Sequence, residues 1–127
     1  MELLSRVLPA SVLLVAAFAV PVPARAAELV MFEAGGCTWC RTWHEVIGPI
    51  YPRTDEGRIA PLRRVDKDGP RPDDLLHIEG IVFTPTFVVV EAGHEVGRIT
   101  GFPGEDFFWG MVGQIVAKVK SPGPSGS

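Results

Sequence analysis

The sequence predicts an α/β protein: one four-stranded mixed sheet with helices on both faces. Apolar, β-branched runs alternate with segments whose apolar residues recur every three or four positions, the periods of strands and helices. The resulting order is strand, helix, strand, helix, strand, strand, helix (βαβαββα). Strands joined through helices can lie parallel, whereas two consecutive strands form an antiparallel hairpin. The only two cysteines, Cys37 and Cys40, lie where the first strand meets the first helix.

The first strand is expected over residues 28–33, a short apolar run that is followed by two glycines. The next helix opens at the two cysteines. Its apolar residues fall at spacings of four, three and four, which favours a single stripe facing the sheet. That stripe consists of Trp39, Trp43, Val46 and Ile50. Gly48 and Pro49 are expected to end this helix, and residues 52–57 to form its exit loop.

The middle of the chain predicts a second strand and a short helix. Residues 61–66 form the strand and residues 67–72 a polar loop. A helix is expected over residues 73–79, because Asp73 and Asp74 would stand near its positive end.

A hairpin and a final helix complete the fold. The β-branched and aromatic residues 86–91 mark a central strand, and a short turn leads back into residues 95–100. The final helix follows Gly104 and carries seven apolar residues at helical spacing. These are Phe107, Phe108, Met111, Val112, Ile115, Val116 and Val119.

The chain is expected to contain one domain, residues 27–120, between two segments outside the fold. Residues 1–26 have the pattern of a signal peptide cleaved after Ala26. Their apolar run is shorter than the roughly 20 residues that a membrane-spanning helix needs, which disfavours a retained anchor and stable membrane insertion. Residues 121–127 form a Pro/Gly/Ser tail that is predicted to be disordered.

Charge and export limit the classes of partner. The formal net charge is −3 and basic residues form no cluster, so nucleic acid is a poor candidate partner. Export implies an oxidising compartment, in which a pair of neighbouring thiols does not stay reduced by itself. Another protein must therefore set its redox state.

The segment from Cys37 to Cys40 favours redox chemistry. At the first turn of a helix the two sulfurs can form a disulfide, and the free N–H groups of the helix stabilise a thiolate on the first cysteine. Cys37 is therefore the expected nucleophile and Cys40 the resolving thiol. A purely structural disulfide is the alternative, but so short a loop restricts the unfolded chain little.

Two other kinds of function stay open. The thiolates could bind copper(I), which prefers soft sulfur ligands. A non-catalytic module could instead use the surface around Trp39 and Pro85 to bind a partner. Structural zinc is disfavoured because the chain has no second C-x-x-C and no closely spaced histidine pair, so no metal site and no cofactor besides the dithiol are expected.

Cys37-x-x-Cys40 at the strand–helix junction and Thr84-Pro85 before the hairpin resemble the thioredoxin-fold family over residues 28–119. The resemblance implies a cis Thr84–Pro85 bond beside the dithiol, with the Thr84 backbone free to pair with an extended substrate. It also implies that Gly101 lets the partner backbone approach. A trans proline and an ordinary turn glycine are the alternatives. Trp39 either contacts substrate or covers the core.

One position departs from the typical cytosolic thioredoxins. Those proteins carry a buried aspartate that assists deprotonation of the resolving thiol, and the matching residue here is Met31. Glu33, His44 or water could take over that proton, or deprotonation is unassisted. We expect Glu33 to point to a different face from Met31, and His44 to be a surface histidine.

Further motifs are similar to the periplasmic thioredoxin-like proteins of bacterial sulfur-oxidation gene clusters. They are Phe32-Glu33-x-x-Gly36-Cys37-x-x-Cys40, Trp43-His44, Gly48-Pro49-Ile50-Tyr51-Pro52, Thr84-Pro85-Thr86-Phe87 and the run from Gly101 to Trp109. That resemblance implies a reductive role in the periplasm. The protein substrate would be a carrier protein whose cysteine is kept as a thiol, and a membrane thiol transporter would supply the electrons.

Overall fold

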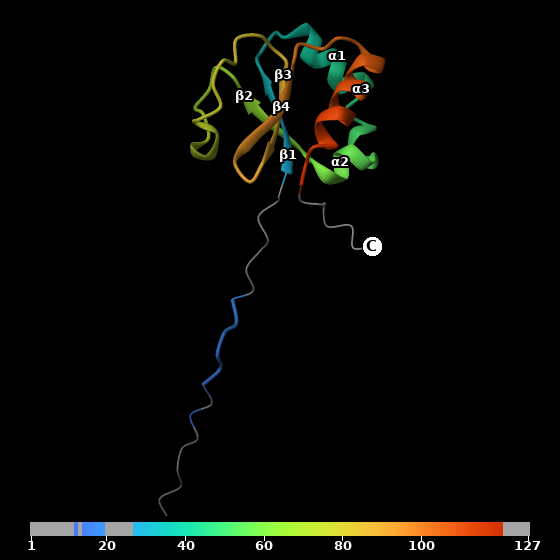
Figure 1. The fold of residues 1–127 in the computed structure, drawn as a ribbon. Helices are drawn as coiled ribbons and strands as arrows, with labels where there is room; N and C mark the ends of the chain where they lie inside the picture. The colour runs from blue at the N-terminus through green and yellow to red at the C-terminus, as the bar shows by residue number, and fades with distance from the viewer. Residues whose placement is uncertain (1–11, 13, 20–26, 121–127) are drawn as a thin grey trace, which may run out of the picture.

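The computed structural model describes residues 12, 14–19 and 27–120 (Figure 1). The predicted tail, 121–127, and most of the predicted signal peptide, 1–26, lie outside the described residues. Within the described part, no helix is both long and apolar enough to cross a membrane.

The sheet has four strands in the order β2-β1-β3-β4. They are β1 (Ala27–Glu33), β2 (Leu62–Asp66), β3 (Thr86–Glu91) and β4 (His94–Thr100). β1 pairs with β2 in parallel, while β3 lies antiparallel to both β1 and β4. The predicted mixed four-stranded sheet is confirmed, and each strand lies within two residues of its expected bounds.

Three α-helices lie on one side of the sheet, as Figure 1 shows. They are α1 (Thr38–Val46), α2 (Asp55–Ile59) and α3 (Glu105–Val116). The core on this side is aromatic: the Trp43 ring lies 5.2 Å from that of Phe87 and 5.7 Å from that of Phe108, centroid to centroid. Trp43 therefore joins α1, β3 and α3, and fixes the helix that carries the cysteines.

The other side of the sheet is covered by the segment between β2 and β3. The predicted helix over 73–79 is too long, because only one 3-10 turn forms there, η2 (Asp73–Leu75). Leu75 packs against the sheet, and the Arg71 guanidinium both donates to the Ile78 carbonyl oxygen at 2.7 Å and lies over the Phe32 ring. Arg71 thereby holds an irregular backbone on this face, where an α-helix was expected.

The exit loop predicted over 52–57 contains two helical segments that the sequence reading missed. These are the 3-10 helix η1 (Tyr51–Arg53) and the start of α2. The Thr54 hydroxyl caps α2 by accepting a hydrogen bond from the Gly57 N–H at 3.0 Å. Asp55 follows in the first turn, where the helix dipole favours a negative charge.

The two predicted apolar stripes had different outcomes. In α1, only Trp43 of the predicted stripe is buried, and Cys40 and Ile47 complete the buried face instead. The buried face is centred between Trp43 and Cys40, so Trp39 and Val46 lie at its edge and are exposed, while Ile50 lies beyond the end of α1. In α3 the members facing the sheet are buried as predicted, namely Phe108, Val112, Ile115 and Val116, whereas Phe107 and Met111 face outward.

Candidate active site

The sheet topology brings three segments to one edge. β1 ends at Glu33, β3 begins at Thr86, which pairs with Phe32, and β4 ends at Thr100, which pairs with Thr86. The loop to Cys37, the segment before β3 and the residues after β4 therefore leave the sheet together. Cys37, Pro85 and Gly101 are far apart in the sequence, and this register places them at the same end of the sheet.

The two cysteines form a disulfide at the start of α1. Their Cα atoms lie 5.2 Å apart. Cys37 is the N-cap residue of the helix, and its sulfur accepts a hydrogen bond from the Cys40 N–H at 3.2 Å. This N–H and the helix dipole would stabilise a thiolate at Cys37 after reduction. The Cys37 side chain is half-buried and that of Cys40 is buried, so a partner reaches the first sulfur more easily.

The segment before β3 is held against the end of β4. The Thr84–Pro85 peptide bond is cis, and the Gly101 N–H donates to the Pro85 carbonyl oxygen at 2.7 Å. Gly101 has a φ of +82°, a left-handed conformation that favours glycine, and a Cβ added there would meet open space. The left-handed backbone conformation alone is therefore enough to explain a glycine at position 101. It explains this glycine equally well as the close approach of a partner backbone would. Pro85 is buried, while Thr84 beside it is half-buried.

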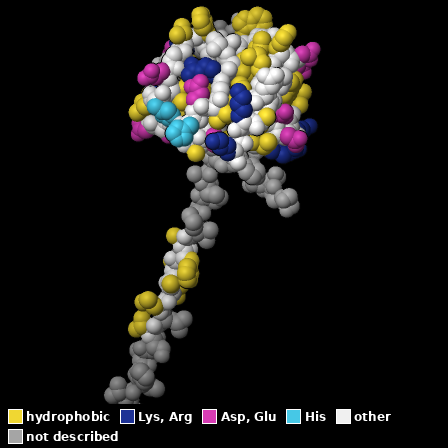
Figure 2. All heavy atoms as spheres, viewed as in Figure 1, with side chains coloured by type: hydrophobic (Ala, Val, Ile, Leu, Met, Phe, Trp, Pro, Cys, Tyr) yellow, Lys and Arg dark blue, Asp and Glu magenta, His cyan; other side chains and the backbone are white. Residues whose placement is uncertain are grey.

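Apolar side chains are exposed on the segments around the disulfide. Trp39 is 60% exposed, and Val82 and Phe83 are each 66% exposed. Figure 2 shows hydrophobic side chains gathered along the upper edge of the domain, the end at which Figure 1 places α1. Exposed apolar surface of this kind is typical of a contact site for another protein. Trp39 does not cover the core, so of its two predicted roles the contact with substrate fits the structure better.

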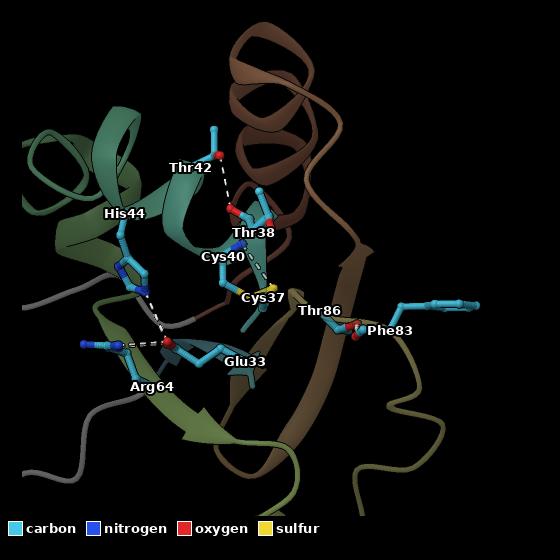
Figure 3. The surroundings of a disulfide bond; sticks show 9 residues. All are labelled: Glu33, Cys37, Thr38, Cys40, Thr42, His44, Arg64, Phe83 and Thr86. Atoms are coloured by element: carbon cyan, nitrogen blue, oxygen red, sulfur yellow. Dashed lines mark hydrogen bonds and ion pairs between the residues drawn. A yellow bond between two sulfur atoms is a disulfide. The ribbon is translucent and has the colours of Figure 1, made fainter. Parts of the chain in front are cut away.

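On the other side of the disulfide, Glu33 forms a charged cluster with His44 and Arg64 (Figure 3). Arg64 donates two hydrogen bonds to the Glu33 carboxylate, at 2.7 and 2.8 Å, and His44 Nε2 lies 3.2 Å from the same group. The expectation that Glu33 and Met31 point to different faces was wrong, because residues two apart on a strand share a face. His44 is a partly buried histidine bonded to Glu33, where an unengaged surface residue was expected.

Arg64 was missed as a member of this cluster. It pairs with Met31 across the parallel β1–β2 ladder, two positions before the level of Glu33. The diagonal contact depends on that register, which local patterning of the chain does not specify. The adjacent arginines of β2 were the only signal: Arg63 pairs with Glu28 and Asp74, and Arg64 with Glu33.

This cluster predicts a loss of stability in acid. The Arg64 hydrogen bonds lower the pKa of Glu33, burial opposes that shift, and His44 adds to it. A carboxyl group with a lower pKa in the folded state stabilises the fold above its unfolded pKa, and this contribution is lost as the pH falls through the folded value. Stability is therefore expected to decline below the ordinary Glu value of 4.5, and Glu33→Gln to remove part of that decline.

Urea unfolding between pH 7 and pH 3 measures this difference. Glu45→Gln is the matched control, since Glu45 is exposed on α1 beside His44 and has no ion pair among the described residues. Its free energy of unfolding should follow that of the wild type at every pH. An E33Q protein with the same pH dependence as the wild type would show that the cluster contributes no acid-sensitive stability.

Comparisons with known proteins identify the family. The structure of the periplasmic thioredoxin SoxS from Paracoccus pantotrophus, in its reduced form, is 45% identical in sequence and has a TM-score of 0.68. The match covers 72% of this chain and 96% of SoxS. The chain belongs to the thioredoxin family. Thioredoxins exchange thiols and disulfides with other proteins and need no cofactor, so the protein is a thiol-disulfide oxidoreductase with Cys37–Cys40 as its C-x-x-C pair.

More distant thioredoxins share the fold. The thioredoxin of Malassezia sympodialis (Mala s 13) is 22% identical with a TM-score of 0.54, over 73% of this chain and 77% of that one. The thioredoxin of Fasciola hepatica gives the same identity and TM-score, over 71% and 81%. No protein-family model matches the chain, and no curated protein matches it. Among the described residues, no group of three or more His, Cys, Asp or Glu side chains is placed to hold a metal ion.

Proposed function

We propose that this thioredoxin is exported to the periplasm and acts there as a reductant, keeping the cysteine of a sulfur-oxidation carrier protein in its thiol form. The observation that carries the proposal is the 45% sequence identity to the periplasmic thioredoxin SoxS, 96% of whose chain is covered by the match. The signal-peptide pattern of residues 1–26 supports export. The motifs shared with thioredoxin-like proteins of sulfur-oxidation gene clusters support this choice of partner.

Cys37 and Cys40 divide the reaction between them in this proposal. The Cys37 thiolate attacks the partner disulfide, forms a mixed disulfide and releases one partner thiolate. Cys40 then attacks the Cys37 sulfur, which restores the Cys37–Cys40 bond and releases the second thiolate. Two electrons pass from the chain to the partner. A membrane thiol transporter returns two electrons to the disulfide for the next cycle.

The exposed surface around the disulfide supports a protein substrate. The exposed side chains of Trp39 and Phe83 offer apolar contacts. Next to Phe83, the Thr84 backbone before the cis proline could pair with an extended peptide as an added strand. Gly101, fixed to Pro85 by its N–H, adds no side chain that would obstruct the peptide.

Trapping with Cys40→Ser tests the proposal. Without the resolving thiol, the mixed disulfide on Cys37 should persist, and the partner can be identified after nonreducing electrophoresis of a periplasmic extract. Cys37→Ser with Cys40 intact is the matched control and should trap little. Recovery of one carrier protein of sulfur oxidation supports the proposal, whereas recovery of many unrelated exported proteins points to general disulfide handling instead.

A further inference from the structure

The segment that joins η2 to β3, all of it within the described residues, forms no helix or strand, and arginine side chains hold its backbone. Three consecutive carbonyl groups accept from guanidinium groups, those of Ile78, Glu79 and Gly80. Arg71 donates to the first at 2.7 Å. Arg98 of β4 donates to the second at 3.0 Å and lies 3.5 Å from the third. Hydrogen bonds from a charged donor are the stronger ones, so these contacts can fix an irregular backbone.

Glu95 fixes the direction of the Arg98 side chain. Its carboxylate accepts two hydrogen bonds from the guanidinium group, at 2.7 Å from Nε and 2.5 Å from Nη2. Arg98 pairs with Val88 across the β3–β4 ladder, and directly paired residues share a face of the sheet. Val88 belongs to the apolar cluster on the side that the segment covers. The guanidinium group therefore links β4 to the segment, and 28% of the Arg98 side chain is exposed.

Further contacts hold the backbone around the exposed pair Val82 and Phe83. Ile81 precedes this pair and packs against the apolar cluster on the same side of the sheet. The hydroxyl of the buried Thr86 donates to the Phe83 carbonyl oxygen at 2.6 Å. Val82 and Phe83 are nevertheless each 66% exposed, and Figure 3 shows the Phe83 ring projecting away from the rest of the domain. Two apolar side chains thus stand in solvent on a backbone that is fixed from β3 and β4.

We propose that Arg98, oriented by Glu95, is a positioning residue for binding of the protein substrate. It holds the backbone immediately before Val82 and Phe83, so these side chains meet the partner in an arrangement that exists before binding. A free backbone would have to be ordered on binding, which weakens association. A small disulfide that reacts with Cys37 needs no contact with this pair. The inference rests on the proposed role of the exposed apolar surface in binding the substrate.

Two substrates separate the binding of a protein from the chemistry at the sulfurs. Second-order rate constants of the reduced protein are measured with insulin disulfides and with dithiobis(nitrobenzoate), a small disulfide. Arg98→Gln is expected to lower the rate with insulin about 2- to 10-fold, the range for ordering one side chain on binding. Its rate with dithiobis(nitrobenzoate) should equal that of the wild type. Glu95→Gln removes the ion pair but keeps the arginine, and should lower the rate with insulin less.

Arg58→Gln is the matched control. Arg58 also pairs with an acid three residues before it, Asp55, and donates to a backbone carbonyl oxygen, that of Arg53, at 2.8 Å. It lies on α2, on the opposite side of the sheet from the segment that Arg98 holds. Arg58→Gln should therefore change neither rate. Backbone order parameters of residues 79–84, from NMR relaxation, should fall in Arg98→Gln and stay at the wild-type values in Arg58→Gln.

Phe83→Ala tests the proposed surface by itself and should also lower the rate with insulin. If Phe83→Ala is slower with insulin but Arg98→Gln reacts at the wild-type rate, the inference is overturned and the proposed surface stands. Equal slowing of Arg98→Gln with both disulfides overturns it as well, because a general structural loss would explain that result. If Phe83→Ala keeps the wild-type rate with insulin, the proposed substrate surface fails, and the inference fails with it.

Discussion

Cys37→Ser is expected to abolish exchange, lowering the rate of protein disulfide reduction on the order of 10³-fold or more. A serine hydroxyl is not ionised at neutral pH, so neither the Cys40 N–H nor the helix dipole can produce an anion comparable to the thiolate. The measurement is the reduction of insulin disulfides, with dithiothreitol as the electron source. The disulfide that Cys37 forms in the oxidised protein is lost too, but its three-residue separation makes the effect on stability small.

Cys40→Ser is expected to lose the second step of the exchange and to keep the first, so it serves as the comparison. It should react once with a disulfide and then stop as the mixed disulfide, because Cys37 keeps its place as the N-cap residue of α1. Steady turnover falls in both variants, but only Cys40→Ser should release one thiolate per molecule in a single turnover. Equal single-turnover release from both variants would contradict the assignment of Cys37 as nucleophile.

Most of the fold follows from local sequence signals. β3 was predicted to the residue because its β-branched and aromatic run fits a buried central strand. The dithiol at the start of α1 follows from its place after a strand and a glycine pair. Where prediction failed, several contacts decided the outcome together. Arg71 holds the segment around η2 in place of a longer helix, and Thr54 starts α2 within an expected loop.

In the site, too, the residues close together in the sequence were predicted and a more distant one was missed. The cysteines lie within four residues of each other, so their pairing could be predicted from spacing alone. The contact between Glu33 and Arg64 joins residues 31 positions apart and depends on how β1 and β2 align. An error of one residue in that alignment would turn Arg64 to the other face of the sheet. Pattern reasoning therefore found the reacting sulfurs and missed a charged group beside them.

Trp43→Ala is expected to cost about 3–5 kcal/mol of unfolding free energy, the range for truncating a fully buried aromatic residue. Its ring is 0% exposed and packs edge-on or tilted against Phe87, Phe108 and Tyr51. Trp39→Ala is the matched control, since Trp39 lies on the same helix and is 60% exposed; it should change stability by less than about 0.5 kcal/mol. Urea unfolding of the oxidised proteins, followed by circular dichroism, measures both.

Trp43→Phe separates ring packing from the indole N–H. Nε1 of Trp43 is buried without a hydrogen-bond partner among the described residues, so phenylalanine removes an unsatisfied donor along with part of the ring. Trp43→Phe should therefore cost about half as much as Trp43→Ala. If all three variants lost the same free energy, packing beneath α1 would not be what holds this helix to the sheet. If Trp43→Ala loses the most unfolding free energy and Trp39→Ala the least, the buried Trp43 ring holds the start of α1, with Cys37 and Cys40, against the sheet. Trp39 on the same helix is then available to contact a partner.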